Sequence, residues 1–140
     1  MPDNDSLTAY KSRIVETILS AIPQCRAIYL FGSWGSSAQR ADSDIDLAVL
    51  PASPLASVPR WELAQLLASR LHRDVDLVDL LAASTVLRMQ VVSHGERLYV
   101  SDENEIEQFE DTVFSSYARL NEERREILND VRRRGSIYGK

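Results

Sequence analysis

Apolar residues recur along the chain with two periods, one typical of helices and one typical of strands. The N-terminal stretch has apolar residues three or four positions apart, at Leu7, Tyr10, Ile14, Ile18 and Ile22. This spacing predicts a helix, with Asp5 and Ser6 as capping candidates and Pro23 as its stop. Two short apolar runs follow at 27–31 and 45–50, and their aliphatic and aromatic side chains predict two strands.

The middle of the chain continues this alternation of helix and strand. A helix with Pro59 near its start is predicted next, because three leucines share one helical face: Leu63, Leu67 and Leu71. A third strand is predicted at 75–80 and a short closing strand at 97–100. Between them, Ser84 is a candidate N-cap and Gly95 a candidate stop for another helix. Helices that alternate with strands from end to end predict an α/β fold, a mixed sheet flanked by helices.

The last part of the chain predicts one long helix. No proline or glycine occurs from Asp102 to about Arg134, and acidic residues crowd the start while arginines crowd the end, as the helix dipole favours. An apolar stripe, interrupted by Arg124, follows spacings of three and four residues through Ile106, Phe109, Val113, Tyr117, Leu120, Ile127 and Val131.

The length of this helix has a consequence for partners. Roughly 33 helical residues span about 50 Å, whereas a domain of this size is only about 30 Å across. One end of the apolar stripe must therefore be covered by something other than its own domain, and a partner protein is the natural candidate. We expect residues 1–101 to form the compact part of one domain, and residues 102–140 to be its long C-terminal helix and tail, which docks the partner.

Composition narrows the class of protein. A chain of 140 residues with 44% hydrophobic and 26% charged residues is typical of a single soluble globular domain. A net charge of −5 argues against direct nucleic-acid binding, which needs basic surface. The single cysteine, Cys25, excludes an internal disulfide and predicts a small buried side chain. No apolar stretch predicts export or membrane insertion, so we expect a cytoplasmic enzyme or binding protein.

A glycine–serine pair and two aspartates carry the candidate chemistry. Asp44 and Asp46 are two residues apart, so on a strand they project from the same face. Parallel carboxylates repel each other unless a cation lies between them, and Mg²⁺ prefers carboxylate and phosphate oxygens. Gly32 lets the backbone approach a phosphate closely, and the Ser33 hydroxyl with neighbouring N–H groups can hold the terminal phosphates of a nucleotide. The pattern predicts a site for a nucleotide and a divalent metal.

These residues belong to a motif with a family resemblance. FGS at 31–33 followed by DSDIDL at 42–47 resembles the signature of polymerase-β-type nucleotidyltransferases. The similarity to this family covers roughly residues 10–100. The short length of the chain points to the minimal nucleotidyltransferases, specifically the MntA-like antitoxins of HEPN/MNT toxin–antitoxin pairs. The resemblance implies a polymerase-β-type fold, with 1–101 as the minimal nucleotidyltransferase domain. It also implies transfer of AMP from ATP, with release of pyrophosphate, to a tyrosine of a cognate HEPN ribonuclease toxin, which is thereby silenced.

The resemblance also implies a third carboxylate on a neighbouring strand, and Asp76 matches that position. Asp76 alternates with apolar residues as Asp44 and Asp46 do, so the three carboxylates converge if their strands are neighbours. A two-metal site is then expected, with Mg²⁺ on Asp44 and Asp46 and a second ion shared with Asp76. By parity Asp79 faces away and is predicted to be a strand-end or turn residue, while Asp74 is a reserve candidate.

The chain also departs from the family pattern. Many relatives carry arginines and a further glycine after the Gly-Ser pair, where this chain has WGSS at 34–37, in a segment predicted to be a loop or a single helical turn. The lost positive charge would weaken the grip on triphosphate unless Arg40 or another residue replaces it. Trp61 is predicted to pack, and His72 and His94, near helix ends without metal-ligand spacing, are given no role.

Two other functions stay open at this point. A non-catalytic antitoxin would neutralise its toxin by binding alone, through the long C-terminal helix and as a hetero-oligomer. A nucleotidyltransferase for a small molecule such as an aminoglycoside is the third possibility, although the chain has no recognisable acceptor domain.

Overall fold

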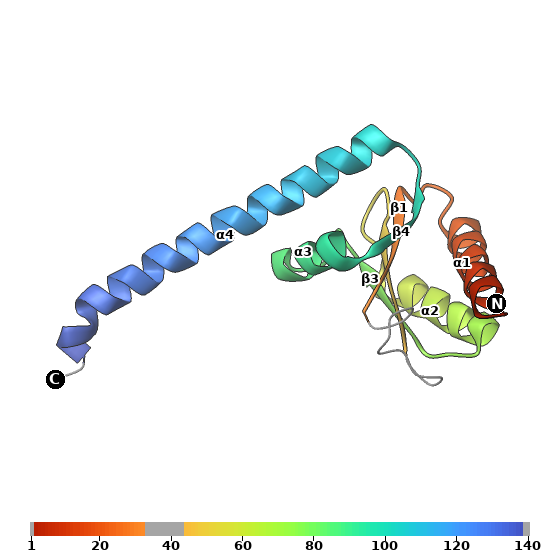
Figure 1. The fold of residues 1–140 in the computed structure, drawn as a ribbon, viewed down its shortest axis with the longest axis horizontal. Coiled ribbons are helices and arrows are strands. Elements are labelled where there is room, and N and C mark those ends of the chain that lie inside the picture. The colour runs from red at the N-terminus through yellow and green to blue at the C-terminus, as the bar shows by residue number, and fades with distance from the viewer. Residues whose placement is uncertain (1, 33–43, 139–140) are drawn as a thin grey trace.

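A mixed four-stranded sheet forms the centre of the protein (Figure 1). This is seen in a computed structural model, which describes residues 2–32 and 44–138. The strand order is β3-β2-β1-β4; β1 pairs antiparallel with β2 and β4, and β2 pairs parallel with β3. The strands are β1 (Ala27–Phe31), β2 (Ile45–Leu50), β3 (Val75–Asp79) and β4 (Glu96–Val100). The predicted α/β class with a mixed sheet is confirmed.

Helices cover both faces of this sheet (Figure 1). On one face lie α1 (Pro2–Ala21) and α2 (Ser57–Leu71), and on the other lie α3 (Thr85–His94) and the first turns of α4 (Glu103–Tyr138). Because strand side chains alternate between faces, the strands divide their apolar residues between two clusters. The first includes Ile14, Ile18, Ile28, Leu30, Ile45, Leu47, Val49, Leu67, Leu71 and Leu77. The second includes Ala27, Tyr29, Ala48, Leu50, Leu80, Val91 and Ile106.

The predicted caps of the helices have mixed outcomes. Ser84 and Gly95 bound α3 as predicted: the Leu87 N–H donates to Ser84 Oγ at 3.1 Å, and the Gly95 N–H donates to the Val91 carbonyl at 2.7 Å. Asp5 and Ser6 are not caps, because α1 already begins at Pro2. Proline is favourable at the first position of a helix, where its missing N–H has no helical partner to lose.

The predicted packing of Trp61 is wrong, because this side chain is 62% exposed. The buried face of α2 consists of Leu63, Leu67 and Leu71, four residues apart. Trp61 lies two positions before Leu63, which turns it about 200° around the helix and away from the sheet. The predicted burial of Cys25 is confirmed, and its thiol donates to the Ala27 carbonyl at 3.2 Å.

The long C-terminal helix is confirmed and extends four residues past its predicted end at Arg134, to Tyr138. Asp102 caps it, since the Glu105 N–H donates to Asp102 Oδ1 at 3.2 Å. Its start packs on the sheet, whereas the rest extends well away from the body of the protein (Figure 1). Within residues 2–32 and 44–138, no helix has the length and hydropathy to cross a membrane.

Candidate functional site

The pairing of the strands brings the predicted aspartates to one end of the sheet. Asp46 of β2 lies opposite Phe31 of β1 on one side and opposite Asp76 of β3 on the other. Partners in a parallel register stand on the same face, with the strands about 4.8 Å apart. Asp44 directly precedes β2, where the Ile45 N–H donates to the Asp74 carbonyl at 2.9 Å. The starts of β2 and β3 thus carry Asp44, Asp46 and Asp76 side by side.

These carboxylates share the sheet face that α3 and α4 cover. Ala48 and Leu50 continue the row of Asp44 and Asp46 along β2, and both belong to the cluster under these helices. The apolar residues of the row are fully buried, whereas Asp46 is half-buried and Asp44 is exposed. The row therefore changes from core to solvent at Asp46, which places the carboxylates where a ligand can reach them.

Gly32 and Asp46 form the tightest contact of the site. Gly32 has φ +81°, in the left-handed region that favours glycine. A Cβ at this position would overlap Oδ2 of Asp46 and lie 3.0 Å from its Cγ. The glycine therefore makes room for the Asp46 carboxylate, whereas the sequence suggested only that it lets the backbone approach a phosphate. Ser33, WGSS at 34–37 and Arg40 lie outside the described residues.

Among the described residues, the site gathers negative charge. The pKa of Asp46 is raised, first because the carboxyl is removed from water and then because Asp76 and Asp44 are negatively charged. A divalent cation would relieve this repulsion, and a set of carboxylate oxygens suits Mg²⁺. The donor chemistry of these residues therefore suits Mg²⁺. In the part of the chain that the structure describes, no three His, Cys, Asp or Glu side chains are already close enough together to enclose an ion.

Other candidate residues lie outside this arrangement. Asp79 is buried and accepts hydrogen bonds from the Leu55 N–H at 2.8 Å and the Leu81 N–H at 2.9 Å. It is the last residue of β3, so the prediction of a strand-end or turn residue is confirmed. His72 has φ 55° and ends α2, and His94 is the last residue of α3. Asp74 remains a reserve candidate at the start of β3.

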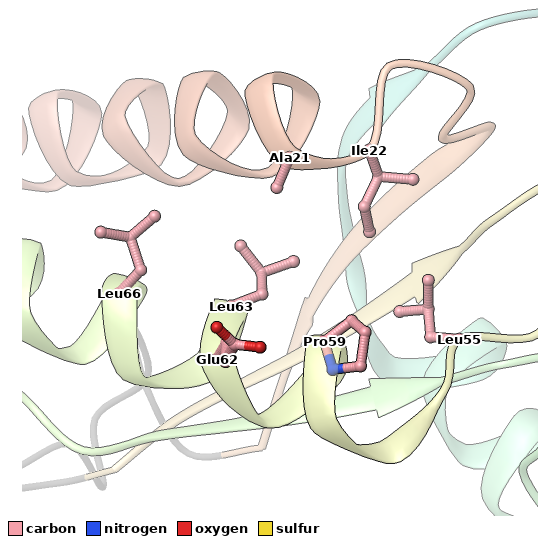
Figure 2. Close-up of a pocket in the computed structure, with 7 residues that line it drawn as sticks. All are labelled: Ala21, Ile22, Leu55, Pro59, Glu62, Leu63 and Leu66. Atoms are coloured by element: carbon pink, nitrogen blue, oxygen red, sulfur yellow. The ribbon is translucent and has the colours of Figure 1, made fainter.

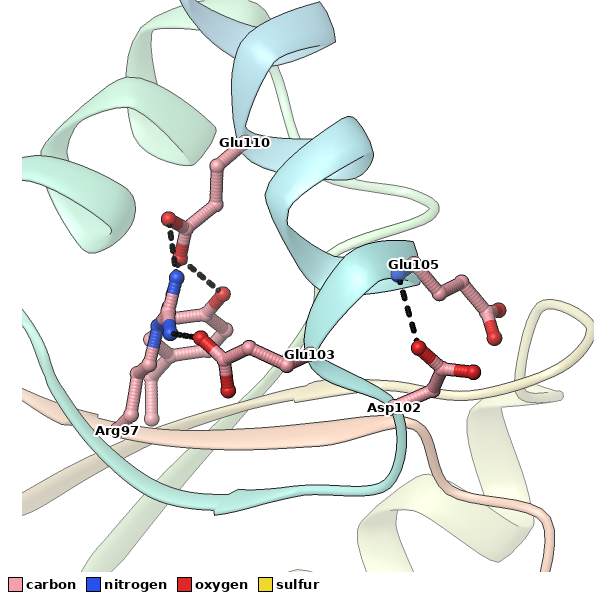
Figure 3. Close-up of polar contacts among 6 residues, drawn as sticks. Arg97, Asp102, Glu103, Glu105 and Glu110 are labelled. Atoms are coloured by element: carbon pink, nitrogen blue, oxygen red, sulfur yellow. Dashed lines mark hydrogen bonds and ion pairs between the residues drawn. The ribbon is translucent and has the colours of Figure 1, made fainter.

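An ion-pair network, which the sequence did not reveal, fixes the base of α4 on the same face (Figure 3). The buried Tyr29 hydroxyl donates to Glu110 Oε2 at 2.7 Å, and Arg97 donates to both Glu110 and Glu103. Burial, followed by the hydrogen bond to Glu110, raises the pKa of Tyr29 well above its usual range. Arg26 adds a second pair, donating to Glu105 at 2.7 Å.

A hollow of about 470 Å³ lies between α1 and α2 (Figure 2). Its lining is mainly apolar and consists of Ala21, Ile22, Leu55, Pro59, Glu62, Leu63 and Leu66. Because α1 and α2 pack on the opposite face of the sheet from Asp46 and Asp76, this hollow is not part of the carboxylate site.

Comparison with known proteins decides the family. The family described as "Polymerase beta, Nucleotidyltransferase" matches residues 14–104, a range that contains Gly32 and all three aspartates. The chain belongs to this nucleotidyltransferase family. Nucleotidyl transfer is therefore the chemistry to which this family membership points.

Individual relatives narrow the comparison. The chain is 46% identical to protein adenylyltransferase MntA of Shewanella oneidensis over 121 residues, and this range covers 86% of each protein. It is similar to a chain in a crystal structure of a toxin–antitoxin with AMP-PNP, with a TM-score of 0.79 and 46% identity over 86% of this chain and 97% of that chain. It also resembles a chain in the complex of tri-AMPylated S. oneidensis HEPN toxin with MNT antitoxin, with a TM-score of 0.76 and 44% identity over 89% of this chain and 97% of that chain.

Proposed function

We propose that this nucleotidyltransferase is an antitoxin that transfers AMP from ATP to a tyrosine of a cognate HEPN toxin and so neutralises it. The observation that carries the proposal is the in-register pair Asp46 and Asp76 beside Gly32, in a fold shared with an adenylyltransferase. Relatives solved with AMP-PNP and with a tri-AMPylated toxin support the donor and the partner. We expect a hetero-oligomer with the toxin in the cytoplasm, where ATP is the donor.

The proposal gives each site residue a role. Gly32 and Ser33 bind the terminal phosphates, Asp44 and Asp46 hold Mg²⁺, and Asp76 shares a second Mg²⁺. Mg²⁺, when bound, neutralises phosphate charge and lowers the pKa of the incoming hydroxyl. The chain itself contributes position: Asp46 is fixed against the Gly32 turn, and the strand register aligns it with Asp76.

The transfer itself is a simple exchange of bonds. The tyrosine oxygen forms a bond to the α-phosphorus of ATP. The bond from the α-phosphorus to the oxygen that bridges the α- and β-phosphates breaks, and pyrophosphate leaves. The hydroxyl proton passes to solvent or to a carboxylate of the site. The products are an AMP-tyrosine ester and pyrophosphate.

Mass spectrometry of the toxin tests the proposed reaction. We expect the full-length chain, with ATP and Mg²⁺, to add AMP to the toxin, and the double substitution Asp44→Asn, Asp46→Asn to reduce this transfer by a factor of about 10³ or more. Asp111→Asn, the same change at an exposed position of α4, is the control and should leave the rate unchanged. A double variant that labels the toxin as fast as the control overturns the assignment.

Neutralisation by binding alone is the alternative that one observation favours. The outer part of α4 exposes apolar residues, including Ile127 and Val131, and is suited to docking a protein. We propose that residues 102–140 dock the toxin in either case. Inhibition of the ribonuclease with no gain of AMP mass would select the binding-only function.

A further inference from the structure

The outer half of α4 has the residue pattern of a coiled-coil seam. From Val113 onward the stripe steps by four and three residues, the a/d spacing of a heptad, through Val113, Tyr117, Leu120, Arg124, Ile127 and Val131. Val113 is buried where α4 packs on α3, whereas Ile127 is 63% and Val131 54% exposed. One continuous seam therefore begins on the protein's own core and continues past it.

The two flanks of this seam differ in chemistry. The e positions on one flank include Phe114 and Leu128, which are 41% and 50% exposed. The g positions on the other flank include Glu123 and Asp130, which line a shallow hollow of about 420 Å³ with Glu126 and Ile127. A helix seated on the seam must therefore offer apolar residues to the flank that carries Phe114 and Leu128.

Arg124 occupies an a position within the otherwise apolar seam. A guanidinium covered by a partner helix loses its hydration and requires a carboxylate opposite to it. A single polar residue at an a position also fixes the register and the choice of partner in coiled coils. We therefore expect the partner helix to carry one acidic residue within its apolar stripe.

A second copy of this chain does not satisfy these requirements. In a parallel pair, Arg124 would face Arg124. In an antiparallel pair, the flanks that carry Glu123 would face each other. Both arrangements bring like charges together, so the seam fits a different protein.

We propose that this seam, Val113 to Val131, binds one amphipathic helix of the toxin, with a carboxylate of that helix paired to Arg124. This inference rests on the proposed function for the identity of the partner. The direction of α4 supports it: the helix leaves the sheet on the side occupied by α3, the same face on which Asp46 and Asp76 lie (Figure 1). A toxin held on the seam is thus on the side of the molecule that the carboxylates face.

Matched substitutions on the two sides of α4 test the seam. The full-length chain is titrated with its cognate HEPN toxin, and the dissociation constant and AMP transfer are both measured. Ile127→Asp should weaken binding by roughly tenfold or more, and should raise KM for the toxin with little change in kcat. Asn129→Asp adds the same charge at the exposed f position, away from the seam, and should bind as the wild type does. Arg124→Glu should weaken binding, whereas Arg124→Lys keeps most of it.

The outcomes separate the seam from the transferase. If the wild type transfers AMP and Ile127→Asp binds as tightly as Asn129→Asp, the seam is wrong. If the wild type binds without transferring AMP while Ile127→Asp loses binding, the seam stands and the transferase function is wrong. If the wild type neither binds nor modifies the toxin, both are wrong. Equal circular dichroism and melting temperatures of the variants ensure that a loss of binding is not a loss of folding.

Discussion

A methyl group at residue 32 would meet two obstacles in this structure. The backbone has φ +81°, which costs a non-glycine residue about 1–3 kcal/mol, and the Asp46 carboxylate occupies the space that Cβ needs. Gly32→Ala should therefore lower the free energy of unfolding by at least this amount and should weaken ATP binding. Urea unfolding measures the first effect and calorimetric titration with AMP-PNP the second.

A double-mutant cycle separates these two obstacles at Gly32. In an Asp46→Ala background the carboxylate is gone and the backbone strain remains, so the cost of Gly32→Ala should fall. Fully additive costs would contradict the contact between Gly32 and Asp46. The sequence indicated a glycine suited to phosphate approach, but it gave no sign of this contact, because the two residues meet only through the pairing of β1 with β2.

Whole elements show where sequence patterns suffice. The bounds of β1 and β2 were predicted because each is a short apolar run, ended by Gly32 in one case and Pro51 in the other. Parity along β2 likewise placed Asp44 and Asp46 on one face. The parallel pairing of β2 with β3 depends on tertiary packing and not on a local pattern. The sequence could therefore predict that Asp46 and Asp76 lie together only on the assumption that their strands are neighbours.

The base of α4 depends on contacts that no local pattern contains. Tyr29 and Glu110 are 81 positions apart in the chain, yet their side chains hydrogen bond at 2.7 Å. Tyr29→Phe removes this donor from a buried position and should cost about 1–2 kcal/mol of stability, while Arg97 still pairs with Glu110. Urea unfolding measures the loss. Tyr99→Phe, at the edge of the other apolar cluster, is the control; an equal effect of both changes would contradict the network.

At the scale of the whole molecule, the core and the site are separate. Two apolar clusters, one on each face of the sheet, hold the helices in place, and the aspartates begin where the second cluster ends. Substituting Asp44, Asp46 or Asp76 should therefore leave the packing of both clusters intact. The outer half of α4 is likewise remote from both clusters, so the proposed docking surface can be altered without disturbing the site.

The charge of the carboxylate site makes the stability of the whole protein depend on pH and on metal. The raised pKa of Asp46 means that its ionised form is disfavoured in the folded state, so without metal its contribution to stability falls as pH rises through the folded pKa. With a chelator present, Asp46→Asn should therefore be more stable than the wild type at pH 7, and the difference should shrink as pH falls toward about 4, the usual pKa of an aspartate. Adding Mg²⁺ should raise the melting temperature of the wild type and leave that of the variant nearly unchanged, because bound ligands stabilise only the state that binds them. Thermal unfolding at each pH, with and without Mg²⁺, measures both effects. A variant that is less stable than the chelated wild type at pH 7 would contradict the repulsion among these carboxylates.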